Sequence, residues 1–130
     1  MTDAELIARF EAGDLTESAF HHADHVRLAF AYLREYSALA ALQGFSDALK
    51  KFAASRGRPQ LYNETITCAY FFLIRERMAR CAPTEIDWEE FARMNPDLLT
   101  WKDGILNRYY REATLKSDLA RRVFIFPDKV

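Results

Sequence analysis

Apolar residues recur at helical spacing along most of this 130-residue chain, and this periodicity constrains its fold more than any other feature. Side chains three and four residues apart share one side of an α-helix, so the pattern predicts helices that each bury one face. Only the short run 123–126, Val-Phe-Ile-Phe, has the character of a strand. The sequence therefore predicts an all-α protein.

Four long helices are expected to form the core. The first runs from a cap at Thr2 or Asp3 to Gly13, and the others cover about 22–36, 37–56 and 62–80. The last of these is apolar around much of its circumference, so we expect it to be the central helix. Gly44 lies inside the third helix and costs about 1 kcal/mol relative to alanine. This predicts a kink or a close helix contact at Gly44.

The C-terminal part of the chain is expected to add shorter helices to this core. Asp87 is placed to cap a helix over 88–94, which Asn95-Pro96 ends. Two further helices are expected over 101–110 and 115–123. The chain lacks internal repeats and linkers, so residues 1–130 are predicted to form a single-domain helical bundle, with a four-helix core and short C-terminal helices.

Composition and charge narrow the class further. The chain is half hydrophobic and long enough for one domain with a single core. Its formal net charge is −1 with opposite charges interspersed, which argues against the basic stripe of a nucleic-acid-binding protein. No apolar run approaches the ~20 residues that span a membrane, and the first residues lack signal-peptide features. We therefore expect a cytoplasmic protein without a membrane or nucleic-acid partner.

All three histidines fall within five consecutive positions, at the start of the second predicted helix. His22 and His25 are three residues apart, so they share one helix face and can reach a common point. Val26 and Ala29 continue the same stripe, which predicts that both rings point inward. Imidazole suits metal ligation and proton transfer near neutral pH, so this cluster locates a site without naming its reaction.

Glu64, at the start of the fourth long helix, is the residue expected to complete that site. Its helix face is largely apolar, and a carboxylate buried there without a partner would cost several kcal/mol. With His22 and His25 it would form a site for one divalent transition metal (zinc, iron, manganese or nickel). The same residues equally suit a metal-free acid–base pair. A structural hydrogen-bond network is the third interpretation.

Further polar residues are candidates for the same pocket. Tyr62 is assigned a catalytic role, and Asn63, Arg27, Thr67 and Arg75 are assigned to substrate binding. An inward arginine would bind a carboxylate or phosphate through paired hydrogen bonds, whereas the plainer alternative is a surface ion pair. The sequence has no glycine-rich phosphate loop, Gly-x-Ser-x-Gly motif or Cys/His nucleophile pair, which removes most well-marked enzyme classes.

Three segments in this order resemble a family of small, all-helical bacterial proteins of uncharacterised function. They are His22-Ala23-Asp24-His25-Val26, Tyr62-Asn63-Glu64-Thr65-Ile66-Thr67, and the run 115–121 that leads to Pro127-Asp128. In that family an aromatic-x-His-x-x-His-hydrophobic helix start precedes a Tyr-His-Glu-Thr-Ile-Thr block. The resemblance implies that His22, His25 and Glu64 belong to one constellation, and it implies no named activity.

The chain departs from this pattern at Asn63, where the family block has a histidine. If that histidine is a metal ligand in relatives, the site here is reduced to two histidines and one carboxylate, or holds no metal. Asn63 can still orient a substrate by hydrogen bonds. The departure therefore favours metal-free acid–base chemistry.

Two functions from different classes remain open at this point. The favoured one is a small enzyme, a hydrolase or lyase, with a pocket between the second and fourth helices. It would hydrolyse, hydrate or eliminate from a small polar metabolite. The alternative is a non-catalytic interaction module, in which the cluster fixes helix packing and Trp88, Trp101 and Tyr109 form the interface. A homodimer is compatible with both.

Overall fold

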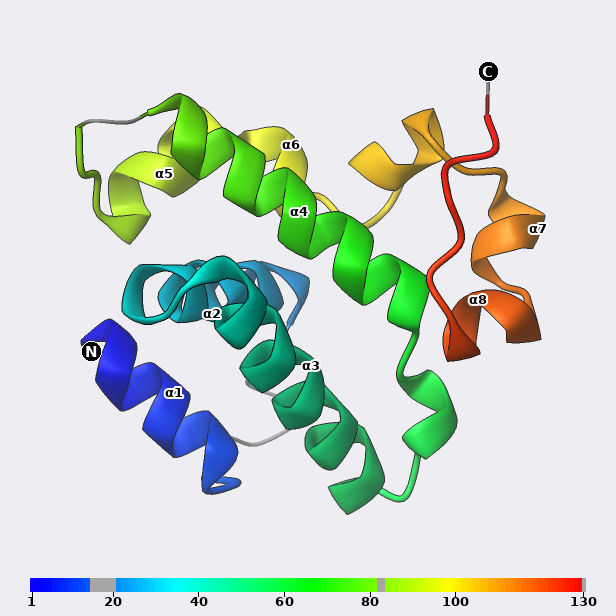
Figure 1. Ribbon diagram of the computed structural model, residues 1–130, viewed down its shortest axis with the longest axis horizontal. Coiled ribbons are helices and arrows are strands. Elements are labelled where there is room, and N and C mark those ends of the chain that lie inside the picture. Colours follow the sequence, from blue (N-terminus) through cyan, green and yellow to red (C-terminus); the bar gives the residue numbers. More distant parts are fainter. Residues whose placement is uncertain (15–20, 82–83, 130) are drawn as a thin grey trace.

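The computed structural model describes residues 1–14, 21–81 and 84–129, and all regular structure in these ranges is helical (Figure 1). Eight α-helices, α1 to α8, and the short 3₁₀ helices η2 and η3 follow one another, with no strand in the described ranges. The expectation of an all-α protein is confirmed. None of the described helices has the length and apolar character needed to cross a membrane.

The four long helices lie close to the ranges that periodicity predicts. They are α1 (Asp3–Glu11), α2 (His22–Glu35), α3 (Ala38–Ser55) and α4 (Glu64–Arg80), with η2 (Pro59–Leu61) between the last two. Polar caps fix two of the starts: the Thr2 hydroxyl accepts from the Glu5 backbone N–H at 3.1 Å, and the Asn63 side chain accepts from the Ile66 N–H at 2.9 Å. Such caps satisfy N–H groups that the first turn of a helix leaves unpaired.

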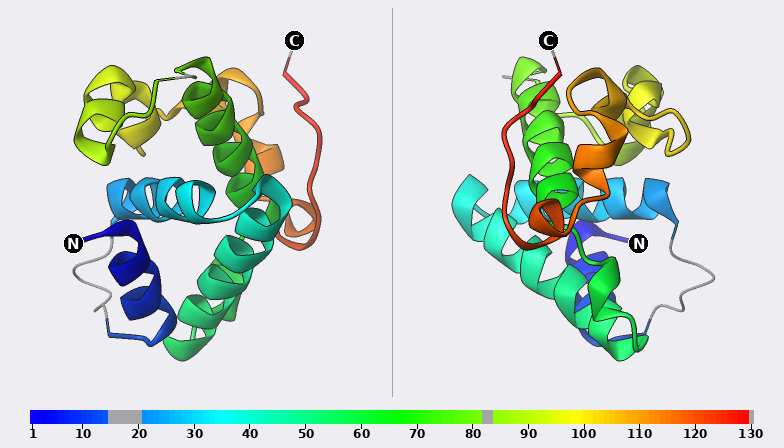
Figure 2. Two further views of the ribbon diagram at one scale, coloured as in Figure 1. Left: turned by 60° about the vertical axis from the view of Figure 1, so that its left-hand side comes forward. Right: turned by 90° about the vertical axis from the view of Figure 1, so that its right-hand side faces the viewer.

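The central helix is α2, not α4 as expected. Five consecutive residues of α2, from Leu28 to Tyr32, are buried, so neighbours cover every side of this helix. The neighbours are α1, α3, α4 and α6, and Figure 2 shows α2 enclosed by them. In α4, by contrast, Phe72 and Arg75 are exposed. The apolar composition of α4 suggested that it would be the central helix. It is not, because α4 leaves part of its apolar surface in solvent.

Gly44 marks a close contact between α2 and α3, one of the two outcomes expected there. A Cβ atom added at Gly44 would lie 2.7 Å from the Tyr32 ring, which is itself buried. No side chain larger than hydrogen fits without moving that ring. The glycine therefore sets how closely the two helices approach.

The C-terminal helices are shorter and more numerous than the pattern predicts. They are α5 (Trp88–Met94), α6 (Pro96–Leu99), η3 (Ile105–Arg108), α7 (Glu112–Leu115) and α8 (Asp118–Arg122). The expected helix over 101–110 is wrong because Asp103 has a positive φ of 52° and only a 3₁₀ turn follows it. The helix expected over 115–123 is present as α8 but begins later, because Ser117 caps it by accepting from the Ala120 N–H. Pro96 begins α6, although it was expected only to end α5.

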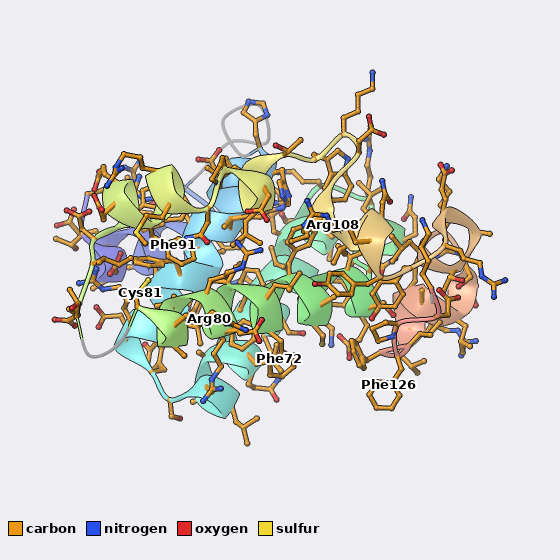
Figure 3. All side chains as sticks on the ribbon, turned by 90° about the horizontal axis from the view of Figure 1, so that it is seen from above. Phe72, Arg80, Cys81, Phe91, Arg108 and Phe126 are labelled. Carbon is orange, nitrogen blue, oxygen red and sulfur yellow. The ribbon has the colours of Figure 1, made fainter. Side chains whose placement is uncertain are left out.

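The C-terminal helices belong to the core as well as extending it. Phe91 of α5 and Leu98 of α6 are fully buried, and the Phe91 ring lies 4.9 Å from that of Phe30 in α2. Trp88 packs 5.6 Å from the same Phe30 ring and is partly buried. In Figure 3, Phe91 lies among the helices, whereas Phe126 projects away from them.

The last described residues, 123–129, form an extended segment along α4. Thr65, which is fully buried, donates from its hydroxyl to the Val123 carbonyl at 2.8 Å and accepts from the Ile125 N–H at 3.1 Å. The Tyr110 hydroxyl donates to the Ile125 carbonyl at 2.6 Å. The strand-like run 123–126 is thus extended, but in the described part of the chain side chains hold it rather than a second strand.

Candidate functional site

A cavity of about 580 Å³ opens between α2, α3, η2 and α4. This volume lies within the range of small-molecule pockets, roughly 300–1,000 Å³. Most of the surface of its wall is aromatic or aliphatic, and the polar groups of several side chains interrupt it. The lining residues are His22, His25, Val26, Phe45, Leu49, Phe52, Ala53, Arg56, Gln60, Leu61, Tyr62, Asn63, Ile66, Thr67, Tyr70, Ile74, Trp101, Leu115, Lys116 and Arg121.

His22 stands at the first position of α2, and its orientation is fixed by a backbone hydrogen bond. Its Nε2 lies 2.9 Å from the Leu98 carbonyl oxygen in α6. A carbonyl can only accept, so Nε2 carries the proton in the neutral ring and Nδ1 is left as an acceptor. The ring packs against both Tyr70, at 4.8 Å, and Trp101, at 5.1 Å, which also contact each other. Burial lowers the pKa of His22, which outweighs the opposing effect of the Leu98 hydrogen bond.

His25 lies one turn further along α2 on the same wall of the cavity. Burial, reinforced by the nearby His22, lowers its pKa from 6.5 to about 4, and Asp24 opposes this only in part. Both rings are therefore neutral near pH 7. The prediction that they share one inward face is confirmed by their common position on the cavity wall. As neutral imidazoles they can accept or donate a proton without adding charge to an apolar site.

Glu64 does not join the histidines, because its carboxylate is engaged elsewhere. The Tyr62 hydroxyl donates to Glu64 Oε1 at 2.5 Å, and the Ser46 hydroxyl of α3 lies 2.7 Å from the Tyr62 oxygen. Since the single Tyr62 proton goes to the carboxylate, Ser46 is the donor to Tyr62. Burial, then the Glu64 hydrogen bond, raises the pKa of Tyr62, so this phenol stays protonated. Glu64 is absent from the cavity wall, and its partner is a tyrosine.

The metal triad that the sequence suggested is not assembled. Among residues 1–14, 21–81 and 84–129, no three histidine, cysteine, aspartate or glutamate side chains gather closely enough to hold a metal ion. His22 and His25 come together on the cavity wall, but Glu64 turns to Tyr62. Metal binding therefore stays a prediction from the sequence.

The residues expected to bind substrate divide into two groups. Asn63 and Thr67 line the cavity; the Asn63 amide also donates to the Leu115 carbonyl at 2.9 Å, which ties the start of α4 to α7. Arg27 and Arg75 lie outside the cavity wall. Arg27 donates to the Met1 carbonyl at 3.3 Å, and Arg75 is exposed. Neither arginine is placed to contact a ligand there.

Three cationic side chains on the cavity wall were missed by the sequence analysis. Arg56 comes from the end of α3, and Lys116 and Arg121 come from the α7–α8 region. The only sequence signal for the latter two is that they lie in the third segment of the family resemblance. Arg56 follows the apolar stripe of its helix and gives no signal of its own. No aspartate or glutamate lines the cavity among the described residues.

The interface proposed for the alternative function is only partly available. Trp101 is 60% exposed and Tyr109 is exposed as well, but Trp88 packs into the core. Trp101 also borders a second cavity of about 540 Å³, which shares Ile66, Tyr70, Leu115 and Lys116 with the first. Its indole ring is therefore a natural spectroscopic reporter of both cavities.

Comparison with known proteins adds no family to this description. No protein-family model, curated protein or solved structure matches the chain. The family resemblance seen in the sequence stays a prediction, and the site's function has to be argued from its own residues.

Proposed function

We propose that the protein binds a small, mainly apolar molecule in the cavity between α2, α3 and α4, and that His22 and His25 act on it as neutral imidazoles. The observation that carries this proposal is that two histidines lie on a cavity wall made largely of aromatic and aliphatic surface. Few polar groups in an apolar pocket are the usual arrangement for orienting a small ligand. We propose a mainly apolar ligand in place of the polar metabolite expected from the sequence, because most of the wall surface is aromatic or aliphatic.

The chemistry proposed is proton transfer during hydrolysis, hydration or elimination. His22 is the better proton acceptor, because its Nε2–H is committed to Leu98 and Nδ1 keeps a lone pair. His25 lies on the same wall and is the second neutral imidazole that can contact the ligand. Tyr62 and Glu64 hold each other and position α3 against α4 through Ser46. We propose that this takes place in the cytoplasm on a small-molecule ligand, without nucleic acid or membrane.

Binding is tested by the fluorescence of Trp101, in a Trp88→Phe background that leaves it the only tryptophan. Titration with decanol, a neutral apolar probe, is expected to give a saturable change. Ala53→Phe fills the cavity from its wall and should abolish that change, whereas Ala54→Phe, its exposed neighbour on α3, should not. Equal responses of the two variants, or no saturable response at all, would overturn the proposed binding.

The chemical part is tested separately with p-nitrophenyl alkanoate esters as probes. We expect wild type to release p-nitrophenol above the buffer rate, and His22→Gln to lose that excess while it still binds decanol. His21→Gln is the matched control, because His21 is exposed and lies off the cavity wall. If esters and a panel of hydration and elimination substrates all react at the buffer rate, the protein binds its ligand without transforming it.

The non-catalytic module remains the second candidate, and two contacts favour it. His22 ties α2 to α6 through Leu98, and Tyr62 ties α3 to α4 through Ser46. Truncating a buried hydrogen-bonding group costs about 1–3 kcal/mol. A large fall in melting temperature for His25→Ala, together with an empty cavity in the decanol titration, would favour the module. A neutral or stabilising change would favour the enzyme.

A further inference from the structure

We infer that the ligand of this cavity is an amphipathic anion, whose charged group is held by Lys116 and Arg121 and whose apolar part lies against α3 and α4. This rests on the proposed binding function and adds the chemical class of the ligand. It comes from the charge of the cavity wall, which the sequence did not reveal. Arg56, Lys116 and Arg121 line it, and among the described residues no carboxylate does.

Lys116 and Arg121 belong to one end of the cavity, beside the start of α4, and Arg56 lines it from the C-terminal end of α3. Arg56 ends α3, which contacts η2, and α8 packs on α4. The Asn63 amide joins the start of α4 to the Leu115 carbonyl, directly before Lys116. The histidines lie at the start of α2, where His22 contacts α6 and Trp101. The cavity therefore has a cationic end, near the start of α4 and α8, and a neutral histidine end.

Lys116 and Arg121 are held by exposed carboxylates that a ligand can replace at little cost. Lys116 pairs with Glu112 at 2.7 Å, and both side chains are about three-quarters exposed. Arg121 donates to Asp118 Oδ1 at 3.1 Å, but Asp118 also accepts from Arg122 Nε at 2.8 Å. One exposed carboxylate thus serves two guanidinium groups. Exposed ion pairs contribute little net stability, so exchanging them for an anion at the cavity mouth costs little.

The wall beside these cations suits an apolar chain. Phe45, Leu49 and Phe52 of α3 line the cavity together with Ile66 and Ile74 of α4. Arg56 lies over the Phe52 ring, 4.9 Å from its centre, so charge and apolar surface adjoin. Removal of apolar surface from water supplies affinity, while Lys116 and Arg121 select the charged end of the ligand. An amphipathic carboxylate or phosphate monoester satisfies both parts.

The test compares three probes with the same alkyl chain, namely decanoate, decanol and decylammonium, by Trp101 fluorescence in the Trp88→Phe protein. We expect decanoate to bind about tenfold more tightly than decanol, as charge-assisted hydrogen bonds predict, and decylammonium to bind most weakly. Added salt should reduce the preference for decanoate. A parallel titration with decyl phosphate shows whether the cationic end prefers a carboxylate or a phosphate.

Substitutions at two neighbouring arginines test whether Arg121 itself holds the anion. Arg121→Gln should remove the preference for decanoate and leave decanol binding unchanged, and Lys116→Gln should reduce it in the same way. Arg122→Gln is the control, since Arg122 shares Asp118 but is exposed and does not line the cavity. Thermal melts confirm that each variant is folded. If Arg121→Gln does not fold, Lys116→Gln takes its place as the test variant.

The possible outcomes separate this inference from the proposed function. Equal binding of decanol and decanoate, or tighter binding of decylammonium, overturns the anion and leaves apolar binding in place. Equal loss of the decanoate preference in Arg121→Gln and Arg122→Gln also overturns it, because bulk charge would then explain the effect. Failure of every probe overturns the proposed function itself.

Discussion

The two ends of the cavity differ in how far their polar side chains are buried. At the histidine end the polar groups are buried, and burial lowers the pKa of both rings so that they are neutral at pH 7. At the other end Lys116 and Arg121 form ion pairs with exposed carboxylates. The difference follows from desolvation, which disfavours charge in the interior and leaves it inexpensive at the surface. One end can therefore exchange protons, and the other can select the charge of a ligand.

The largest expected effect is acid destabilisation through His25. Its pKa in the folded protein is about 4, below the ordinary 6.5, so the unfolded chain takes up the proton first as the pH falls. The stability is complete above about pH 6.5 and is lost as the pH falls towards 4. The difference corresponds to about 3 kcal/mol for this residue.

Urea unfolding at several pH values measures this loss. Between pH 6.5 and 4 wild type should lose more stability than His25→Gln, while the exposed control His21→Gln should follow wild type. Parallel curves for wild type and His25→Gln would show that His25 titrates normally. The histidine end would then not differ from the cationic end in the way described.

An intermediate effect is expected at Thr65, which anchors the segment that follows α8. Thr65→Val keeps the shape but leaves the Ile125 N–H without its side-chain acceptor and the Val123 carbonyl without its donor. We expect a loss of about 1–3 kcal/mol in the free energy of unfolding. Thr65→Ser keeps the hydroxyl and should lose less.

The variants Thr65→Val and Thr65→Ser also test whether the two ends of the cavity act independently. If the anchored segment positions α8, Thr65→Val should weaken the preference for decanoate over decanol, while the pH dependence assigned to His25 stays unchanged. A change in the pH dependence with an intact anion preference would contradict the separation of the two ends.

The smallest expected effect is on metal content. Because Glu64 is hydrogen-bonded to Tyr62 and lies off the cavity wall, we expect protein purified without chelator to contain far less than equimolar zinc, iron, manganese or nickel. Elemental analysis of tag-free wild type and of a His22→Ala/His25→Ala variant measures this. An equimolar metal that the double variant loses would replace the neutral-imidazole proposal with the two-histidine metal site.

Local sequence was sufficient for the first half of the fold. The spacing of apolar residues located α1 to α4, and the three-residue separation of His22 and His25 put both on one wall. These features depend on neighbours three and four positions away, which the sequence displays directly. The same spacing failed at 101–110 and misplaced the start of the helix predicted over 115–123, because Asp103 and Ser117 begin new local structures inside an apparently continuous pattern.

The sequence by itself thus determined an all-α protein with a histidine pair facing inward. Only the tertiary structure decided that Ser46 of α3 joins the Tyr62–Glu64 pair, that α2 is the central helix, and that Lys116 and Arg121 reach the cavity. These outcomes depend on residues far apart in the chain, such as Thr65 and Val123 or Asn63 and Leu115. No local periodicity encodes such pairs, because a side chain takes its partner from whatever the packing of the helices brings within hydrogen-bond distance.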